Sequence, residues 1–259
     1  MRNLFVYLNR KIIAPISLRL TKNKLAKSEY SLRDLEIKFR GKNVWNEIVP
    51  FDFLIWQGCL WAENVVLVGG FNGQSSSILL DRVPHIKVLQ VYEPIPKFYL
   101  ACKEKLHGFG NRAHLYNEAV FDRQSEVKME VASDWSMVSE TSREIKDQFA
   151  TTEEIVVRSV NWQTVIDRLP VSEEFSLFMN CEGSEYTIIR SLLASVRLPK
   201  TIISQTHTTG PRSYQLLYEM RADLCKFYSP LFSADWAWDV WIRKDITSLS
   251  AEESERFIS

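Results

Sequence analysis

Apolar and polar positions along the chain alternate in blocks that predict strands and helices in succession. Short, nearly continuous apolar runs are typical of strands buried on both faces, and apolar residues three or four positions apart are typical of the helices that cover them. The predicted strands are residues 65–68, 87–92, 113–116, 175–180, 201–204 and 236–242. The predicted helices are residues 75–81, 96–106, 161–169, 185–193 and 214–227. This order predicts an α/β fold with a doubly wound, mostly parallel sheet.

The segments outside this alternation divide the chain. Residues 124–160 fit hairpin-like strands with a polar insertion at 133–152, which we expect to lie over the edge or the mouth of the sheet. We therefore predict an N-terminal helical extension (1–58), one domain of catalytic size (59–246) and a C-terminal tail (247–259).

The first 27 residues form a cationic amphipathic segment. It carries seven Lys or Arg residues and no acid, together with apolar residues such as Leu4, Phe5 and Leu8. Its apolar run is too short and too interrupted for a secretory signal or a membrane span, and Pro15 would break a single helix. We interpret it as a helix docked on the domain or on a neighbouring subunit of a homo-oligomer. The alternative is peripheral contact with an anionic membrane surface.

Charge and cysteine usage narrow the class of partner and the compartment. Lys plus Arg and Asp plus Glu balance at 32 each, so no overall field attracts nucleic acid. The four cysteines are isolated, which predicts reduced thiols and neither a disulfide framework nor a zinc site. The four histidines show no ligand spacing, so no metal is expected. The sequence predicts a cytoplasmic protein, with peripheral contact at the inner membrane surface as the alternative location.

The segment VVLVGGFNGQSSSILL, residues 65–80, has the form of a cofactor-binding turn in which glycines allow a ligand to approach the backbone. Glu93 lies 20 residues beyond Gly73, where doubly wound folds place the carboxylate that binds ribose hydroxyls; a solvated strand end is the alternative. The G-G-x-x-G spacing, with bulky Phe71 inside it, differs from the G-x-G-x-x-G of dinucleotide sites. These residues favour a nucleoside cofactor other than a dinucleotide.

Five stretches between about residue 65 and residue 244 form a recognisable set. They are VVLVGGFNG, VYEPIPKFYLACKEKL, NEAVFD, FMNCEGSEYTIIRSLL, and IISQTHTTGPRS with the later WAWDVWIRK. In this order and at these spacings they resemble the FkbM-type family of S-adenosylmethionine-dependent methyltransferases, whose motifs include V-D-V-G-A-N-x-G, F-E-P-x-P and K-I-D-V-E-G-A-E. Glu182, Gly183 and Glu185 match the last of these motifs.

The resemblance implies a seven-stranded class I methyltransferase sheet of the Rossmann-like kind and S-adenosylmethionine as cofactor. It also implies O-methylation, often of a hydroxyl of a sugar, a glycan or a secondary metabolite, as in glycan biosynthesis. The acceptor would therefore be a small molecule or a glycan. The cofactor-binding residues that the resemblance indicates are Gly69, Gly70, Phe71, Gly73, Glu93, Asn117 and Ala119.

Three residues are candidates for chemistry. Glu182 directly follows a buried strand, so it can orient an acceptor or take its proton; capping of the next helix is the alternative. His207 lies in a loop after a strand and is a candidate base, with an ordinary surface histidine as the alternative. Asn180 can hydrogen-bond a ligand but cannot act as a base near neutral pH. Glu185, in the first turn of a helix, is interpreted mainly as stabilising that helix.

The chain also departs from the family pattern. Leu67 and Asn180 replace acids, and Phe178 replaces a lysine. Leu67 removes a charge expected near the glycine loop, on the side that orders the amino-acid end of the cofactor, so we predict a cofactor site that is present but weakened. These departures motivate an alternative function, a catalytically degenerate methyltransferase-like protein that acts as a binding or assembly partner.

Overall fold

The computed structural model describes residues 62–131, 136–138, 153–171, 173–207, 211–233 and 238–246. The predictions for the N-terminal extension, for most of the polar insertion and for the C-terminal tail concern residues outside these ranges. Within them, no helix is both long enough and apolar enough to cross a membrane.

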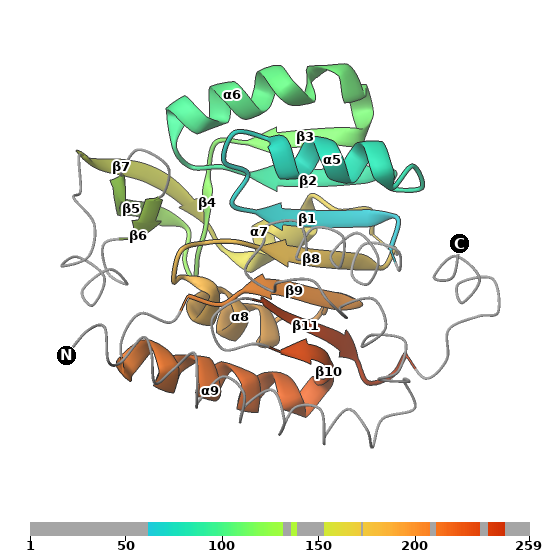
Figure 1. The fold of residues 1–259 in the computed structure, drawn as a ribbon, viewed down its shortest axis with the longest axis vertical. Helices are drawn as coiled ribbons and strands as arrows, with labels where there is room; N and C mark the ends of the chain where they lie inside the picture. The colour runs from blue at the N-terminus through green and yellow to red at the C-terminus, as the bar shows by residue number, and fades with distance from the viewer. Residues whose placement is uncertain are drawn as a thin grey trace, which may run out of the picture.

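A seven-stranded sheet forms the centre of the domain (Figure 1). Its strands are β1 (Asn64–Val68), β2 (Val88–Tyr92), β3 (Ala113–Tyr116), β8 (Phe175–Met179), β9 (Thr201–Gln205), β10 (Tyr228–Ser233) and β11 (Trp238–Arg243). They lie in the order β10-β11-β9-β8-β1-β2-β3. All neighbours are parallel except at β11, which runs antiparallel to both β9 and β10. The predicted α/β fold with a mostly parallel seven-stranded sheet is confirmed.

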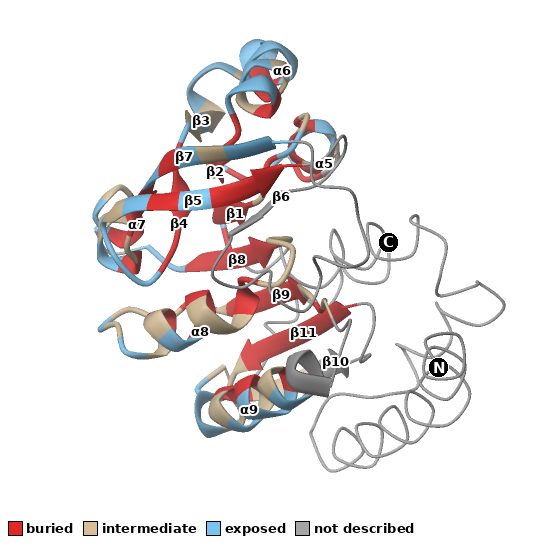
Figure 2. Ribbon diagram, turned by 90° about the vertical axis from the view of Figure 1, so that its left-hand side faces the viewer, coloured by how far each residue is buried: buried red, intermediate tan, exposed pale blue. Residues whose placement is uncertain are grey.

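Helices cover both faces of this sheet because side chains on each strand point alternately to the two sides. The helices are α5 (Gln74–Arg82), α6 (Pro96–Leu106), α7 (Trp162–Asp167), α8 (Glu185–Leu193) and α9 (Pro211–Phe227), with the 3₁₀ segment η2 (His107–Arg112). In β1, Val65 and Leu67 belong to the core that includes residues of α5 and α6. Val66 and Val68 belong to the core on the side of α7, α8 and α9. Figure 2 shows the resulting buried strands in red.

A second, four-stranded sheet occupies the region in which hairpin-like strands were predicted. It contains β4 (Ala119–Val120), β5 (Ser125–Val131), β6 (Ser136–Val138) and β7 (Glu153–Val160) in the order β4-β7-β5-β6. Alternate residues of β5, among them Val127 and Met129, form a small core with Ile95 and Phe98 at the start of α6. This core fixes the small sheet against the carboxyl end of β2.

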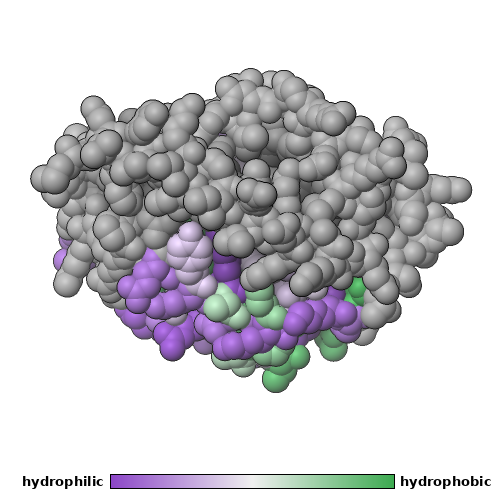
Figure 3. Space-filling model, turned by 60° about the horizontal axis from the view of Figure 1, so that its bottom comes forward, coloured by the Kyte–Doolittle hydropathy of each residue, from purple (hydrophilic) through white to green (hydrophobic). Residues whose placement is uncertain are grey.

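The predicted boundaries agree closely for the strongly periodic elements and fail for one strand. The helices at 96–106 and 185–193 and the strand at 113–116 have the predicted limits. The sequence pattern missed β10, whose six residues include Pro230 and lack a clear alternation. The helix α9 is amphipathic, as predicted, with Leu217, Met220 and Leu224 buried. Figure 3 views the molecule from the bottom of Figure 1. The coloured residues of this face are mostly hydrophilic.

Candidate functional site

The site lies where the strand order of the central sheet reverses direction. The strand β1 sits between β2 and β8, so the loops after β1 and β8 diverge and leave a crevice at their carboxyl ends. The two strand ends are in direct contact, because the backbone N–H of Asn180 donates to the carbonyl of Val68 at 3.0 Å. A ligand in this crevice would meet both loops at once.

The glycine loop approaches its neighbours too closely for side chains. Gly69 has a φ of +93°, and a Cβ built on it would lie 2.0 Å from the backbone oxygen of Asn180. Gly73 has a φ of +78°, and its Cβ would lie 2.9 Å from the Cα of Cys102 on α6. Gly70 is buried against Val91. Glycine is therefore required here by the close packing of the loop against Asn180, β2 and α6, and of the three glycines Gly69 lines the pocket.

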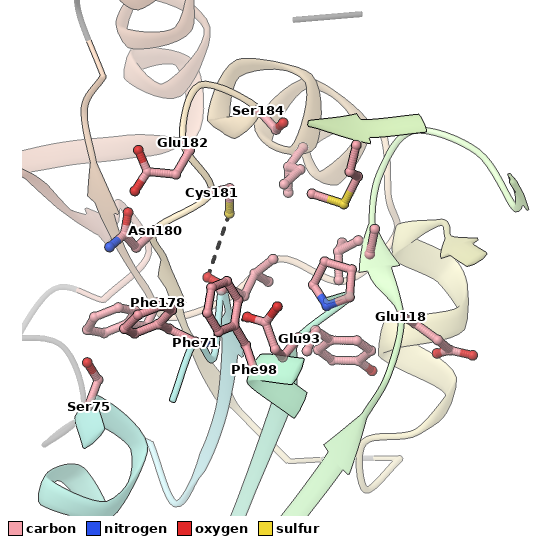
Figure 4. A pocket seen from close by; sticks show the side chains of 18 of the residues that line it. Phe71, Ser75, Glu93, Phe98, Glu118, Phe178, Asn180, Cys181, Glu182 and Ser184 are labelled. Carbon is pink, nitrogen blue, oxygen red and sulfur yellow. Dashed lines mark hydrogen bonds between the residues drawn. The ribbon is translucent and has the colours of Figure 1, made fainter. Parts of the chain in front are cut away.

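Glu93 joins the glycine loop to the start of α6. Its Oε2 accepts from the backbone N–H of Phe71 at 2.7 Å, and its Oε1 accepts from the N–H of Ile95 at 2.9 Å. Burial raises the pKa of Glu93 to about 7, although both N–H donors favour the ionised form. Each carboxylate oxygen keeps a further lone pair, so Glu93 can still accept from ligand hydroxyls. Its side chain lies near the middle of the pocket (Figure 4).

A pocket of about 200 Å³ surrounds this carboxylate. Its lining comprises Val68, Gly69, Phe71, Ser75, Tyr92, Glu93, Pro94, Phe98, Glu118, Ala119, Val120, Met129, Phe178, Asn180, Cys181, Glu182, Ser184, Ile188 and Trp238. The rings of Phe71 and Phe98 lie 4.5 Å apart, between centroids, beside Glu93 (Figure 4). The volume is below the roughly 300–1,000 Å³ of typical ligand pockets. Phe71, with φ 45° and 37% of its surface exposed, is the most exposed of the lining residues.

The segment after β3 contributes differently from the prediction. Ala119 lines the pocket, whereas Asn117 does not and instead donates from Nδ2 to the carbonyls of Glu93 and Pro94 at 2.9 and 3.0 Å. The side chain of Glu118 points away from the pocket interior (Figure 4) and accepts from Arg168 at 2.6 Å. Asn117 therefore supports the backbone that carries Glu93, rather than facing a ligand directly.

The turn between β8 and α8, residues 180–184, places most of the polar groups on the other side of the pocket. Asn180, Glu182 and Ser184 all line it. Two of their buried atoms, Oδ1 of Asn180 and Oγ of Ser184, have no hydrogen-bond partner within the described ranges. Buried polar atoms without partners are uncommon in folded proteins, so these two are suited to contact a ligand.

The structure brings together the two residues predicted to act on the acceptor. The Nε2 of His207 lies 3.2 Å from Oε2 of Glu182, and its Nδ1 lies 2.9 Å from Oε1 of Glu185. Burial lowers the pKa of His207, but the two carboxylates outweigh it and hold that pKa well above its usual range. His207 is therefore an imidazolium at neutral pH, and such a ring has no lone pair to accept a proton.

Glu182 remains a carboxylate for the complementary reason. Its burial favours the neutral acid, but the charge of His207 and then its hydrogen bond prevail, so the pKa of Glu182 is lowered. The adjacent thiol of Cys181 is neutral, because burial and then the charge of Glu185 raise its pKa well above the usual value. Of the polar groups in this turn, Glu182 is the one able to accept a proton from a ligand.

Glu185 makes more contacts than its predicted role in stabilising the helix requires. It stands in the first turn of α8, as expected, but its carboxylate contacts the preceding turn and His207 rather than only the helix. Its match to the glutamate of the family motif was the one available signal. The pairing with His207 could not be read from the chain, because it depends on how β8 and β9 lie side by side.

Two of the departures from the family pattern, Leu67 and Phe178, are apolar side chains that pack against other apolar groups. Leu67 is fully buried in the core beside α5 and α6 and does not line the pocket. Phe178 does line it and packs against Trp238, with ring centroids 5.5 Å apart. At Phe178 the pocket wall therefore carries an apolar ring where the family motif has a lysine. Among the described residues no cluster of His, Cys, Asp and Glu is arranged to hold a metal ion.

Comparison with known proteins gives likenesses of fold but not of sequence. No protein-family model matches the chain, and a search of curated proteins finds no match. The methyltransferase FkbM from Methylobacillus flagellatus is similar over 70% of this chain at 15% identity, with a TM-score of 0.46. This chain covers 43% of the length of that protein.

Two further solved structures are matched over nearly their full length. The S-adenosylhomocysteine-bound methyltransferase PaMTH1 from Podospora anserina has 12% identity, coverage of 89% of this chain and 96% of its own, and a TM-score of 0.47. The O-methyltransferase from Bacillus cereus, also in complex with S-adenosylhomocysteine, has 9% identity, coverage of 92% and 96%, and a TM-score of 0.43. The order of the seven strands and the single antiparallel strand establish that this chain has a class I methyltransferase fold.

Proposed function

We propose that this chain binds S-adenosylmethionine in the pocket around Glu93 and transfers a methyl group to a hydroxyl of a sugar, a glycan or a secondary metabolite. The observation that carries the proposal is the position of Glu93. It is a buried carboxylate at the end of β2, hydrogen-bonded to the glycine loop and open to a pocket at the reversal of the strand order. A resident ribose would satisfy the remaining lone pairs of this group.

The remaining lining supports the same ligand. Gly69 and Asn180 both line the pocket, so backbone atoms at the ends of β1 and β8 could approach the amino-acid end of the cofactor. The unpartnered Oδ1 of Asn180 would accept from its ammonium group. The Phe71 ring would turn outward to admit the adenosyl group, which is larger than the present pocket. The cofactor would supply a methyl group already activated by a sulfonium.

Glu182 would orient the acceptor hydroxyl and receive its proton. His207 lowers the basicity of this carboxylate, so Glu182 first accepts a hydrogen bond from the neutral hydroxyl. The hydroxyl becomes strongly acidic once its oxygen is alkylated, and even a weakly basic carboxylate can then take the proton. Met129 and Ile188 add apolar lining that limits the access of water.

Isothermal titration calorimetry with S-adenosylhomocysteine tests the cofactor site. We expect the wild-type protein to bind and Glu93→Ala to bind about 10- to 100-fold more weakly, as for the loss of hydrogen bonds to a charged group. Glu104→Ala, which removes an exposed carboxylate from α6, should bind like the wild type. Absence of binding to the wild type at saturating ligand would refute the proposal.

Transfer itself is tested with S-adenosylmethionine labelled in the methyl group. The labelled cofactor is incubated with the protein and extracted sugars, glycans or lipid-linked sugars, and the label is traced to an ether. Glu182→Gln should bind S-adenosylhomocysteine normally and transfer the label more slowly. Cofactor binding without transfer to any hydroxyl acceptor would instead favour a binding or assembly role.

A further inference from the structure

The turn that presents Glu182 has a conformation that requires support. Glu182 has a φ of 50° and the following Gly183 a φ of 101°. A non-glycine residue in the left-handed region typically costs about 1–3 kcal/mol. Such a conformation persists only when the surrounding contacts hold it. Contacts to the turn at residues 180–184 must therefore stabilise this conformation.

The carboxylate of Glu185 supplies these contacts. Oε1 of Glu185 accepts from the backbone N–H of Cys181, and Oε2 accepts from the N–H of Gly183, both at 2.9 Å. These donors lie on either side of Glu182. The carboxylate of Glu185 is almost fully buried, so the two bonds are shielded from water. Glu185 thereby fixes the backbone of Glu182 from both directions.

The same carboxylate also fixes the side chain of Glu182 through an intermediary. Nδ1 of His207 lies 2.9 Å from Oε1 of Glu185, and Nε2 lies 3.2 Å from Oε2 of Glu182. With both ring nitrogens protonated, the imidazolium donates one hydrogen bond to each glutamate. The ring is planar and rigid, so anchoring one nitrogen determines the direction of the other.

Helix stabilisation alone does not account for these contacts. An acid in the first helical turn interacts favourably with the free N–H groups and the dipole of its own helix. Glu185 instead accepts from Cys181 and Gly183, which both precede α8, and from the ring that follows β9. The hydrogen bonds of Glu185 connect the segments that follow β8 and β9. The carboxylate of Glu182, which lies between these contacts, lines the pocket.

We propose that Glu185 is the positioning residue of this site, because it anchors the backbone on both sides of Glu182 and the ring of His207, and so directs the Glu182 carboxylate into the pocket. Its catalytic meaning rests on the function proposed above, whereas the anchoring is a property of the ligand-free protein. The two can therefore be tested separately.

Nuclear magnetic resonance of the histidine rings is the deciding measurement. The chain has four histidines, and the His207 signals are assigned by their loss in His207→Gln. In the wild type we expect His207 to titrate well above the ordinary range of a histidine, because the carboxylates of Glu185 and Glu182 stabilise its charged form. In Glu185→Gln its titration should move down by at least one pH unit, because the nearest carboxylate is lost. Glu219→Gln, which removes an exposed carboxylate hydrogen-bonded to Tyr186 and Gln215, should leave the titration unchanged.

Amide hydrogen exchange supplies the backbone readout. The N–H groups of Cys181 and Gly183 should exchange at least tenfold faster in Glu185→Gln, while the amides of the central strand β1 keep their protection. Unchanged His207 titration in Glu185→Gln, or a wild-type His207 that titrates near pH 6.5, would overturn the inference; the second result needs no variant to fold. A wild-type protein with an anchored His207 that fails to bind S-adenosylhomocysteine would refute the proposed function alone.

Discussion

Replacing Gly69 by alanine should damage the domain more than any other single methyl group added to the glycine loop region. The added Cβ would stand 2.0 Å from the backbone oxygen of Asn180, where an ordinary contact requires about 3.4 Å or more. The oxygen belongs to the backbone of the residue directly after β8, which is hydrogen-bonded to Val68, so it cannot rotate away. Strand β8 and the loop would therefore have to separate, and the crevice that they form would change shape.

Two physical costs add in this variant. A φ of +93° costs an L-residue about 1–2 kcal/mol, and forcing a methyl group into packed structure costs a further 1–3 kcal/mol or so. The loss of unfolded-state entropy on replacing Gly by Ala offsets about 0.4–1 kcal/mol. The free energy of unfolding should fall by about 2–4 kcal/mol, which lowers the Tm of a domain of this size by about 4–16 °C.

Alanine substitutions at two other glycines distinguish the cost of the positive φ from the cost of the steric clash. Gly110 has a φ of +55° but open space around its Cβ position, and Gly108 has open space and no such φ. Thermal unfolding followed by circular dichroism should rank Gly69→Ala well below Gly110→Ala, with Gly108→Ala at or above the wild type. Calorimetry should show that Gly69→Ala also loses S-adenosylhomocysteine binding. A Gly69→Ala protein as stable as Gly108→Ala would refute the steric reasoning.

Two further predictions concern ionised groups. The pKa of Glu93, about 7 in the folded protein against an ordinary 4.5, means that its contribution to stability is greatest below pH 4.5 and is lost as the pH rises through 7. Ribose binding requires the ionised form, so S-adenosylhomocysteine affinity measured by calorimetry should fall up to tenfold per unit below pH 7, and Glu93→Gln should abolish that dependence. Asp239 is fully buried and accepts two hydrogen bonds from Arg221, so Asp239→Asn should lower the free energy of unfolding in urea by about 3–5 kcal/mol. Asp245→Asn, at an exposed ion pair with Arg243, should change it by less than about 1 kcal/mol, and equal effects would contradict this assignment of burial.

Most helices and strands could be predicted because they depend on the spacing of apolar residues that are close in the sequence. The helices at 96–106 and 185–193 show apolar residues at helical spacing, and the buried strands are nearly continuous apolar runs. The strand β10 lacks such a pattern and forms because β11 offers it a paired edge. Its place in the sheet therefore had to come from the tertiary structure.

The sequence by itself determined the βα order of the domain, the glycine loop after β1 and the carboxylate Glu93 at the end of β2. These features depend on neighbouring residues and on backbone conformations that glycine alone adopts easily. The tertiary structure decided which way side chains turn: Asn117 toward the backbone of Glu93, and Leu67 into the core. It also decided that His207 lies between Glu182 and Glu185, because that contact joins the ends of two parallel strands, and strand order is set by packing of the whole sheet.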